Sequence, residues 1–170
     1  MAFMDLAEKR YSVRLFTKEQ IPDKKLQDIL EIARLAPTSQ NDQPQRLFVL
    51  QSDEAIGKLE QAAGKIVKAP TYILVAYDSR ETRDRSYPRL DGGTISATIV
   101  STYLMLGAFD EGLGSIWIGD VDLGVLKNSL GLEEEIVPVG VMAIGFPSVE
   151  SKPAPAHKKR KPVAKTTRYL

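Results

Sequence analysis

The stretch from residue 91 to residue 111 constrains the fold most, because it predicts a long helix with almost no polar face. Asp91 is a typical helix N-cap. Apolar residues then fall on every side of the helix: Ile95, Ile99, Val100, Tyr103, Leu104, Leu106 and Phe109. Such a helix needs burial all round. A chain of 170 residues, 43% of them hydrophobic, could enclose it in one domain, but a subunit interface would also cover it. We therefore expect a homodimer.

Shorter apolar segments flank this helix. Further helices are expected at about residues 5–10, 23–36, 53–63 and 122–130, with Asp23, Asp53 and Asp122 as N-caps. Strands are expected at residues 47–50, 71–77, 115–119 and 139–146. The second of these strands is apolar almost throughout, which is typical of strands covered on both faces. We expect helices on both sides of one sheet.

The change in composition after residue 150 suggests the domain organisation. Residues 1–150 are expected to form a single domain, and residues 151–170 a basic extension with no apolar periodicity to hold it on a core of its own. The charged segment 78–90 is either a lid or a mobile connection.

The absence of cysteine and the single histidine narrow the chemistry. Without cysteine there is no disulfide, no thiolate metal ligand and no cysteine nucleophile, which fits a reducing cytoplasm. One histidine, His157 in the basic tail, makes a histidine metal cluster impossible and a Ser-His-Asp triad implausible, so we expect it to be solvated. No apolar run approaches the ~20 residues of a membrane helix, and Rossmann and P-loop glycine motifs are missing. We expect a soluble, cytoplasmic protein.

The net charge of +1 conceals an uneven distribution. Seven of the 23 Lys and Arg residues follow Glu150 and no acidic residue does, which leaves 16 basic against 22 acidic residues in residues 1–150. A basic tail alone is typical of a solvated arm or of weak nucleic-acid contact. An acidic body would repel a polyanion, so we expect no nucleic-acid partner and favour a small anionic ligand.

A candidate anion site lies near the N-terminus, in the sequence Arg10-Tyr11-Ser12-Val13-Arg14. Each guanidinium offers a planar fork of donors that matches phosphate oxygens, and the Ser12 hydroxyl adds a third contact. A bound phosphate is the first expectation. The alternative is a solvated surface segment.

A second polar segment, Ala-Pro-Thr-Ser-Gln-Asn-Asp-Gln-Pro at residues 36–44, separates an expected helix from an expected strand. In this order, the arginine segment and the polar loop resemble the nitroreductase family of FMN-dependent reductases. The sequence Gly-Leu-Gly-Ser-Ile-Trp-Ile-Gly at residues 112–119 and the basic tail extend the resemblance over nearly the whole chain. The resemblance implies an α+β fold, an α/β/α sandwich around a mixed sheet, with a C-terminal segment that crosses to the partner subunit.

The resemblance also implies which residues contact FMN. Around the phosphate and ribityl chain they are Arg10, Tyr11, Ser12, Arg14, Lys158 and Arg160. From the partner subunit they are the loop residues Pro37, Thr38, Ser39, Asn41 and Gln43, and along the ring they are Trp117, Ile118, Gly119 and Asp120. Lys65 matches a basic residue near the N1/C2 carbonyl edge, where negative charge gathers on reduction; the alternative for Lys65 is an exposed lysine after a helix-ending glycine.

The implied activity is transfer of hydride from NAD(P)H through FMN to a nitroaromatic, quinone or related acceptor, with ping-pong kinetics and no essential acid–base residue. Two alternatives stay open: another flavin chemistry on the same scaffold, such as dehalogenation or flavin fragmentation, and a non-catalytic FMN-binding protein. The sequence does not choose between NADH and NADPH.

Overall fold

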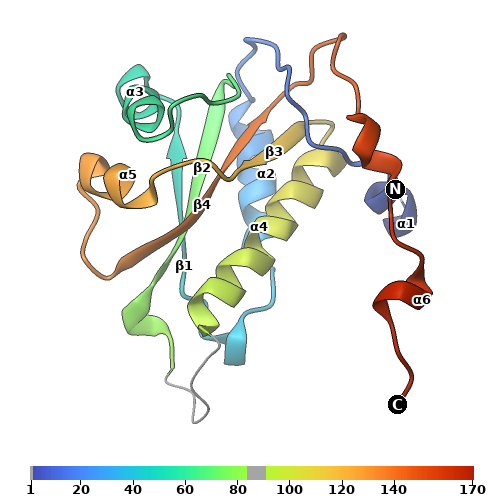
Figure 1. The fold of residues 1–170 in the computed structure, drawn as a ribbon. Helices are drawn as coiled ribbons and strands as arrows, with labels where there is room; N and C mark the ends of the chain where they lie inside the picture. The colour runs from blue at the N-terminus through green and yellow to red at the C-terminus, as the bar shows by residue number, and fades with distance from the viewer. Residues whose placement is uncertain (1, 84–90) are drawn as a thin grey trace.

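A computed structural model describes residues 2–83 and 91–170 (Figure 1). The helices are α1 Phe3–Lys9, α2 Asp23–Arg34, α3 Asp53–Ala62, α4 Gly92–Asp110, α5 Leu123–Leu130 and α6 Val163–Thr166. The strands are β1 Gln45–Leu50, β2 Thr71–Asp78, β3 Gly114–Ile118 and β4 Ile136–Gly145. The described residues also contain the short 3₁₀ helices η1 Ser39–Asn41, η2 Ser79–Glu81 and η3 Pro155–Lys158.

The four strands form one sheet in the order β1-β2-β4-β3. Each neighbouring pair is antiparallel, with Leu74 of β2 opposite Phe48 of β1 and Val141 of β4. The expected mixed sheet is thus antiparallel among its named strands, and its parallel element is a single bridge between Ser12 and Ser115. Every residue of β2 is buried, because this central strand is covered on both faces, as its continuous apolar sequence predicts.

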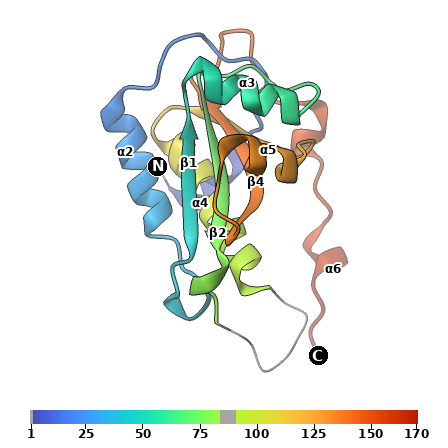
Figure 2. The same ribbon diagram turned by 90° about the vertical axis from the view of Figure 1, so that its left-hand side faces the viewer.

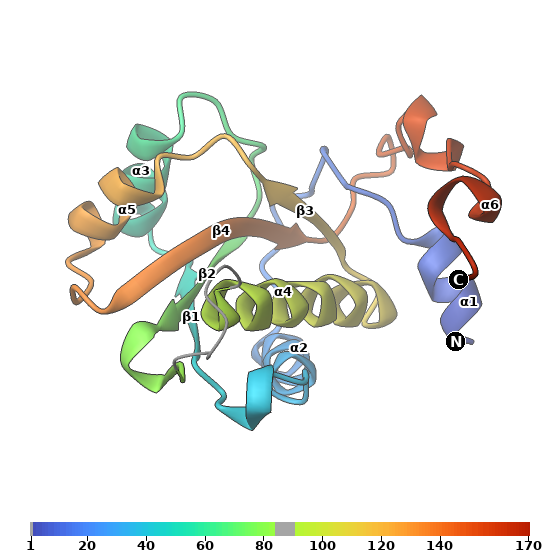
Figure 3. The same cartoon turned by 60° about the horizontal axis from the view of Figure 1, so that its bottom comes forward.

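Helices cover both faces of the sheet and define two apolar cores (Figure 3). On one face, α2 and α4 pack on alternate residues of β2, including Ile73 and Val75. On the other face, α3 and α5 pack on Leu74 and its neighbours in β4 and β3. Figure 2 shows α3 and α5 together on that second side. This arrangement confirms the expected α+β sandwich.

Helix α4 is only partly buried by its own chain. The Asp91 side chain accepts a hydrogen bond of 2.9 Å from the Gly93 N–H, so the predicted N-cap is present. Fully buried residues face the sheet and α2: Ala97, Val100, Leu104 and Ala108. Ile95, Ile99, Tyr103 and Leu106 stay partly exposed on other sides. One chain therefore does not supply the all-round burial that the helix sequence demands.

The sequence predicted no segment long and apolar enough for a membrane helix. Judged by length and composition alone, that prediction is wrong. Among the described residues one helix, the 19-residue α4, meets that criterion. A helix packed into a protein core meets it equally well, and α4 buries one side against the sheet.

Two predicted caps are also wrong. Pro22, not Asp23, occupies the N-cap of α2, and Asp23 is the first helical residue. Helix α3 is capped by Ser52, whose hydroxyl accepts from the Ala55 N–H at 3.2 Å. Asp53 again lies one position inside, where a carboxylate still favours the positive end of the helix dipole.

The last twenty residues leave the sheet and run beside α1 (Figures 1 and 3). They are largely exposed and contain only η3 and the single turn α6. Of the candidate lid at residues 78–90, residues 84–90 lie outside the described residues. Asp78 ends β2, and residues 79–81 form η2.

Candidate functional site: a cationic pocket between the two ends of the chain

The arginine segment, residues 10–14, lies along the free edge of β3. The Val13 N–H donates to the Ser115 carbonyl oxygen at 3.0 Å, next to the parallel Ser12–Ser115 bridge. Gly114 permits this approach, because a Cβ built there would lie 2.4 Å from Val13 Cγ2. The segment is therefore held on the sheet edge by backbone contacts, which leaves the arginine side chains available for a ligand.

The tail returns to this segment from the other end of the chain. The Tyr11 hydroxyl donates to Ser151 Oγ at 3.2 Å, and His157 Nε2 lies 3.0 Å from the Glu8 carbonyl oxygen. Together the two ends form a pocket of about 210 Å³, which we call the arginine pocket. Its lining residues are Arg10, Tyr11, Ser12, Arg14, Ala154, Ala156, His157 and Arg160.

The arginine pocket holds positive charge without a counter-charge. Within residues 2–83 and 91–170, no ion pair involves Arg10, Arg14 or Arg160. Arg10 Nη1 is buried and lacks a hydrogen-bond partner, and so does the Oγ atom of Ser115 on the adjoining strand. Burial lowers the pKa of Arg10, and the positive charge of Arg160 lowers it further. A buried guanidinium donor without a partner, next to a second positive charge, does not stabilise a fold but is suited to binding an anion.

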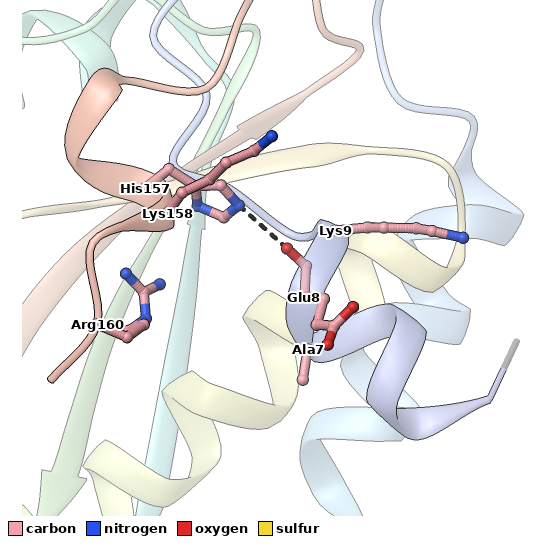
Figure 4. A pocket seen from close by; sticks show the side chains of 6 residues that line it. All are labelled: Ala7, Glu8, Lys9, His157, Lys158 and Arg160. Atoms are coloured by element: carbon pink, nitrogen blue, oxygen red, sulfur yellow. Dashed lines mark hydrogen bonds between the residues drawn. The ribbon is translucent and has the colours of Figure 1, made fainter. Parts of the chain in front are cut away.

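Lys158 is not in the arginine pocket. It lines a larger neighbouring pocket of about 500 Å³, which we call the lysine pocket, with Ala7, Glu8, Lys9, His157 and Arg160 (Figure 4). The two pockets share His157 and Arg160. Two tail cations were expected at the phosphate. The structure brings Arg160 to the arginine segment but places Lys158 in the neighbouring lysine pocket.

The polar loop lies at the opposite end of α4. The Ser39 N–H donates to Ser96 Oγ at 3.0 Å in the first turns of α4, whereas α1 packs near Leu106 and Asp110 at the other end. A helix of 19 residues is about 28 Å long. Within one chain, the structure therefore does not bring the predicted loop residues to the arginine pocket. These residues are Pro37, Thr38, Ser39, Asn41 and Gln43.

The backbone of this loop is strained. Gln40, Asn41 and Gln43 have φ values of 52°, 60° and 50°, in the left-handed region that residues other than glycine rarely adopt. A hydrogen bond of 3.1 Å from the Gln43 N–H to Thr38 Oγ1 closes the loop. Strained backbone clusters at binding sites, where the conformation presents polar groups to a ligand.

The residues expected along the flavin ring follow β3. The Trp117 ring lies over Gly140, where a Cβ would come within 2.1 Å of the indole, and 36% of the residue is exposed. Ile118 is buried in the core beneath α3 and α5, so its side chain is not available to a ligand. Gly119 and Asp120 are exposed.

Lys65 lies in the loop after α3 and is exposed. The Asp122 N–H donates to the Ala62 carbonyl oxygen at 2.9 Å, which ties the end of α3 to the segment that follows β3. Lys65 and Asp120 are each within three residues of this contact. The ion pairs formed by the described part of the chain do not include Lys65. The arrangement keeps Lys65 near the expected ring segment and leaves its ammonium group available.

His157 is the site residue that the sequence did not reveal. The expectation that it is solvated is wrong: it is half-buried, contacts Glu8, and lies edge-on to Tyr11 with 6.3 Å between ring centroids. The one available signal was its place three residues before Arg160, but its partners lie about 150 residues away in the chain.

The sheet covered on both faces and the cationic pocket at its edge define an α+β protein with a candidate site for a small anionic ligand. A model of the nitroreductase family matches residues 7–69 and 63–146, so the chain belongs to the nitroreductase family.

Solved structures and relatives agree with this assignment. A nitroreductase family protein from Clostridium difficile superposes with a TM-score of 0.90 at 33% identity, covering 99% of this chain and 98% of that chain. A relative from Archaeoglobus fulgidus, named for NADH dehydrogenase and NAD(P)H nitroreductase, is 29% identical over 148 residues, 83% of each chain. An Exiguobacterium sibiricum protein solved in complex with FMN shares the fold, with a TM-score of 0.84 at 24% identity and coverage of 100% of this chain and 98% of that chain.

Proposed function

We propose that this protein is an FMN-dependent oxidoreductase that takes electrons from NAD(P)H and reduces a small acceptor such as a quinone or nitroaromatic compound. The observation that carries the proposal is the buried Nη1 atom of Arg10, which has no hydrogen-bond partner and lies beside Arg160 in a pocket of about 210 Å³. A pocket of this size fits a phosphate group and its first attached atoms. Membership of the nitroreductase family and the FMN complex of a structural neighbour support FMN as the phosphate-bearing cofactor.

The chain's own groups have distinct roles in this proposal. Arg10, Arg14 and Arg160 neutralise the phosphate, and the Ser12 hydroxyl donates to it. Trp117 and the backbone of residues 118–120 support the ring, and the Lys65 ammonium places positive charge near its edge. FMN, when bound, supplies hydride transfer in two half-reactions. The protein contributes placement, exclusion of water and electrostatics.

We also propose that the working unit is a homodimer with two sites, each built from both chains. The loop at residues 37–43 and the arginine pocket lie at opposite ends of α4 in one chain, so a second chain would supply the missing half of each site. An apolar groove of about 540 Å³ between α1, α2 and α4 is open to receive that chain. Phe3 at its rim is 73% exposed, far more than is usual for a large apolar side chain.

The first test is colour. Purified protein should be yellow and should release FMN on denaturation. Under anaerobic conditions NADH or NADPH should bleach it before any acceptor is added, and a quinone or nitro compound should then restore the colour. Parallel initial-rate plots at several acceptor concentrations would support a ping-pong scheme.

Other results would redirect the proposal. Protein that binds FMN but is not reduced by either nicotinamide cofactor would favour a non-catalytic flavoprotein or a different flavin chemistry. Protein that cannot be reconstituted with FMN would refute it. Sedimentation of the holoprotein below micromolar concentration tests the dimer, and a stable FMN-loaded monomer would contradict the shared site.

A further inference from the structure

His157 joins the tail to α1 through one ring nitrogen only. Its Nε2 atom lies 3.0 Å from the Glu8 carbonyl oxygen (Figure 4). A carbonyl oxygen can only accept, so Nε2 carries the hydrogen of this bond. In the neutral ring the other nitrogen, Nδ1, is then unprotonated, and Figure 4 shows it on the side of the ring away from Glu8. Protonation of His157 therefore adds a donor at Nδ1 without breaking the contact with α1.

The ring is held in place, unlike its neighbours in the tail. His157 is half-buried, whereas Lys158, Lys159 and Arg160 are exposed. Tyr11 lies edge-on to the imidazole, with an angle of 72° between the two rings. Of the pocket-lining residues named above, His157 and Arg160 alone belong to both pockets. Such a side chain can position a ligand, because little rotamer freedom remains to be lost on binding.

The charged groups that line the two pockets together with His157 are mostly positive. Glu8 and Lys9 come from α1, Arg10 and Arg14 come from the arginine segment together with the phenol of Tyr11, and Lys158 and Arg160 come from the tail. A phosphate bound in the arginine pocket would bring a negative charge to the ring and favour its protonated form.

We infer that His157 is a phosphate ligand, which binds the flavin phosphate through protonated Nδ1, so that cofactor binding and protonation of this histidine favour each other. The inference rests on the proposed FMN site. Linkage is reciprocal: if protonation strengthens phosphate binding tenfold, bound phosphate moves the titration midpoint of the ring up by about one pH unit.

The direct test uses the fact that this chain has one histidine. In untagged protein its ring protons can be assigned without ambiguity by NMR. We expect the titration midpoint to move to higher pH when FMN is added to the apoprotein, and to stay unchanged when riboflavin, which lacks the phosphate, is added. A midpoint unaffected by FMN, or moved equally by riboflavin, would overturn the inference.

A binding test complements the titration. His157→Gln keeps a side-chain N–H that can reach the Glu8 carbonyl but cannot be protonated. At pH 6 it should weaken FMN binding about tenfold, the loss expected for one charge-assisted hydrogen bond, and leave riboflavin binding unchanged. The ratio of wild-type to variant affinity cancels the titration of FMN itself, and it should shrink towards one by pH 8.5. Equal weakening of FMN and riboflavin would mean that His157 only holds the tail, and no weakening of either would also contradict the inference.

Lys159→Gln is the matched control. It removes a neighbouring tail charge that lines neither pocket, so it should alter FMN affinity much less than His157→Gln at pH 6. An equal effect would indicate a general loss of positive charge and would count against a specific role for His157. If the wild-type apoprotein binds riboflavin and FMN equally or binds neither, the proposed phosphate site itself fails. If it prefers FMN and His157 shows no linkage, only the present inference fails.

Discussion

Two groups of arginines in this protein have opposite surroundings. Beyond the end of β2, Arg80 makes a two-pronged contact with Asp78, with Nε–Oδ1 at 2.9 Å and Nη2–Oδ2 at 2.6 Å, and also reaches Glu133 at 3.2 Å. Arg46 completes this network with Glu81 at 2.7 Å. In the arginine pocket, by contrast, Arg10, Arg14 and Arg160 line one cavity and no carboxylate pairs with them in the part of the chain that the structure describes.

The difference separates a structural use of arginine from a ligand-binding use. In the first group each guanidinium is neutralised within the fold, and the hydrogen bonds from Arg80 lower the pKa of Asp78 to about 2. In the second group burial and the charge of Arg160 lower the pKa of Arg10, so we expect an external anion to stabilise the group. The two groups should therefore respond in opposite ways when a charge is removed.

The largest effect is expected from removal of the tail. Deletion from Pro155 onward removes His157, Lys158 and Arg160 together, and loss of two or more charge-assisted contacts at about 1.5–3 kcal/mol each should weaken FMN binding by roughly a hundredfold or more. Deletion of residues 167–170 is the control, because it removes Arg168 but no residue that lines either pocket. Unchanged FMN affinity after the longer deletion, measured by flavin fluorescence, would refute the role of the tail.

A single substitution in each arginine group tests the comparison directly. Arg10→Leu should weaken FMN binding about tenfold or more, while the apoprotein keeps or gains stability because an unpartnered buried donor is gone. Arg80→Leu should leave FMN affinity unchanged and lower the urea midpoint of unfolding, because buried Asp78 loses its two-pronged partner. If Arg10→Leu destabilised the apoprotein as much as Arg80→Leu does, the distinction between a ligand-binding and a structural arginine group would be refuted.

A fall in pH should weaken the stabilising contribution of the Arg80–Asp78 group. Asp78 has a pKa lowered from 3.8 to about 2, principally by its hydrogen bonds with Arg80. A carboxylate with a depressed pKa stabilises the folded state fully above its unfolded value, and this contribution disappears as the pH falls from about 4 towards 2. Thermal melting between pH 2 and 5 should show a steeper loss of stability for the wild type than for Asp78→Asn. Parallel curves would show that this ion-pair network contributes nothing.

Lys65 is a third case, an exposed cation outside both groups, and its effect should be the smallest. Lys65→Ala should slow flavin reduction by NAD(P)H several-fold, in line with about 1 kcal/mol for an exposed charge, and should change FMN affinity less than that. Anaerobic stopped-flow measures the first quantity and fluorescence titration the second. Lys68→Ala, another exposed lysine in the same loop, is the control. A larger effect on binding than on reduction would return Lys65 to the role of an ordinary surface residue.

Local sequence patterns determined much of this protein. Residues close together in the chain explain the N-caps Asp91 and Asp122 and the burial of β2 on both faces. They also explain the end of α5 at Gly131, whose backbone is in the left-handed region. The Pro22 and Ser52 caps were misassigned because an aspartate favours both the N-cap and the first helical turn, which differ by one residue. The family pattern, read along the sequence, also predicted that Arg10 and Arg160 bind one phosphate; the structure brings both residues to one pocket, and the binding itself stays a prediction.

Tertiary structure decided what no local pattern could. Whether Arg160 or Lys158 reaches the arginine segment depends on how the tail crosses α1, and the contact of His157 with Glu8 joins residues 149 positions apart. The antiparallel sheet order likewise arises from pairing between distant strands. The physical reason is that helix caps and periodicity depend on interactions over a few residues, whereas the charge and shape of a pocket are sums over side chains that only folding brings together.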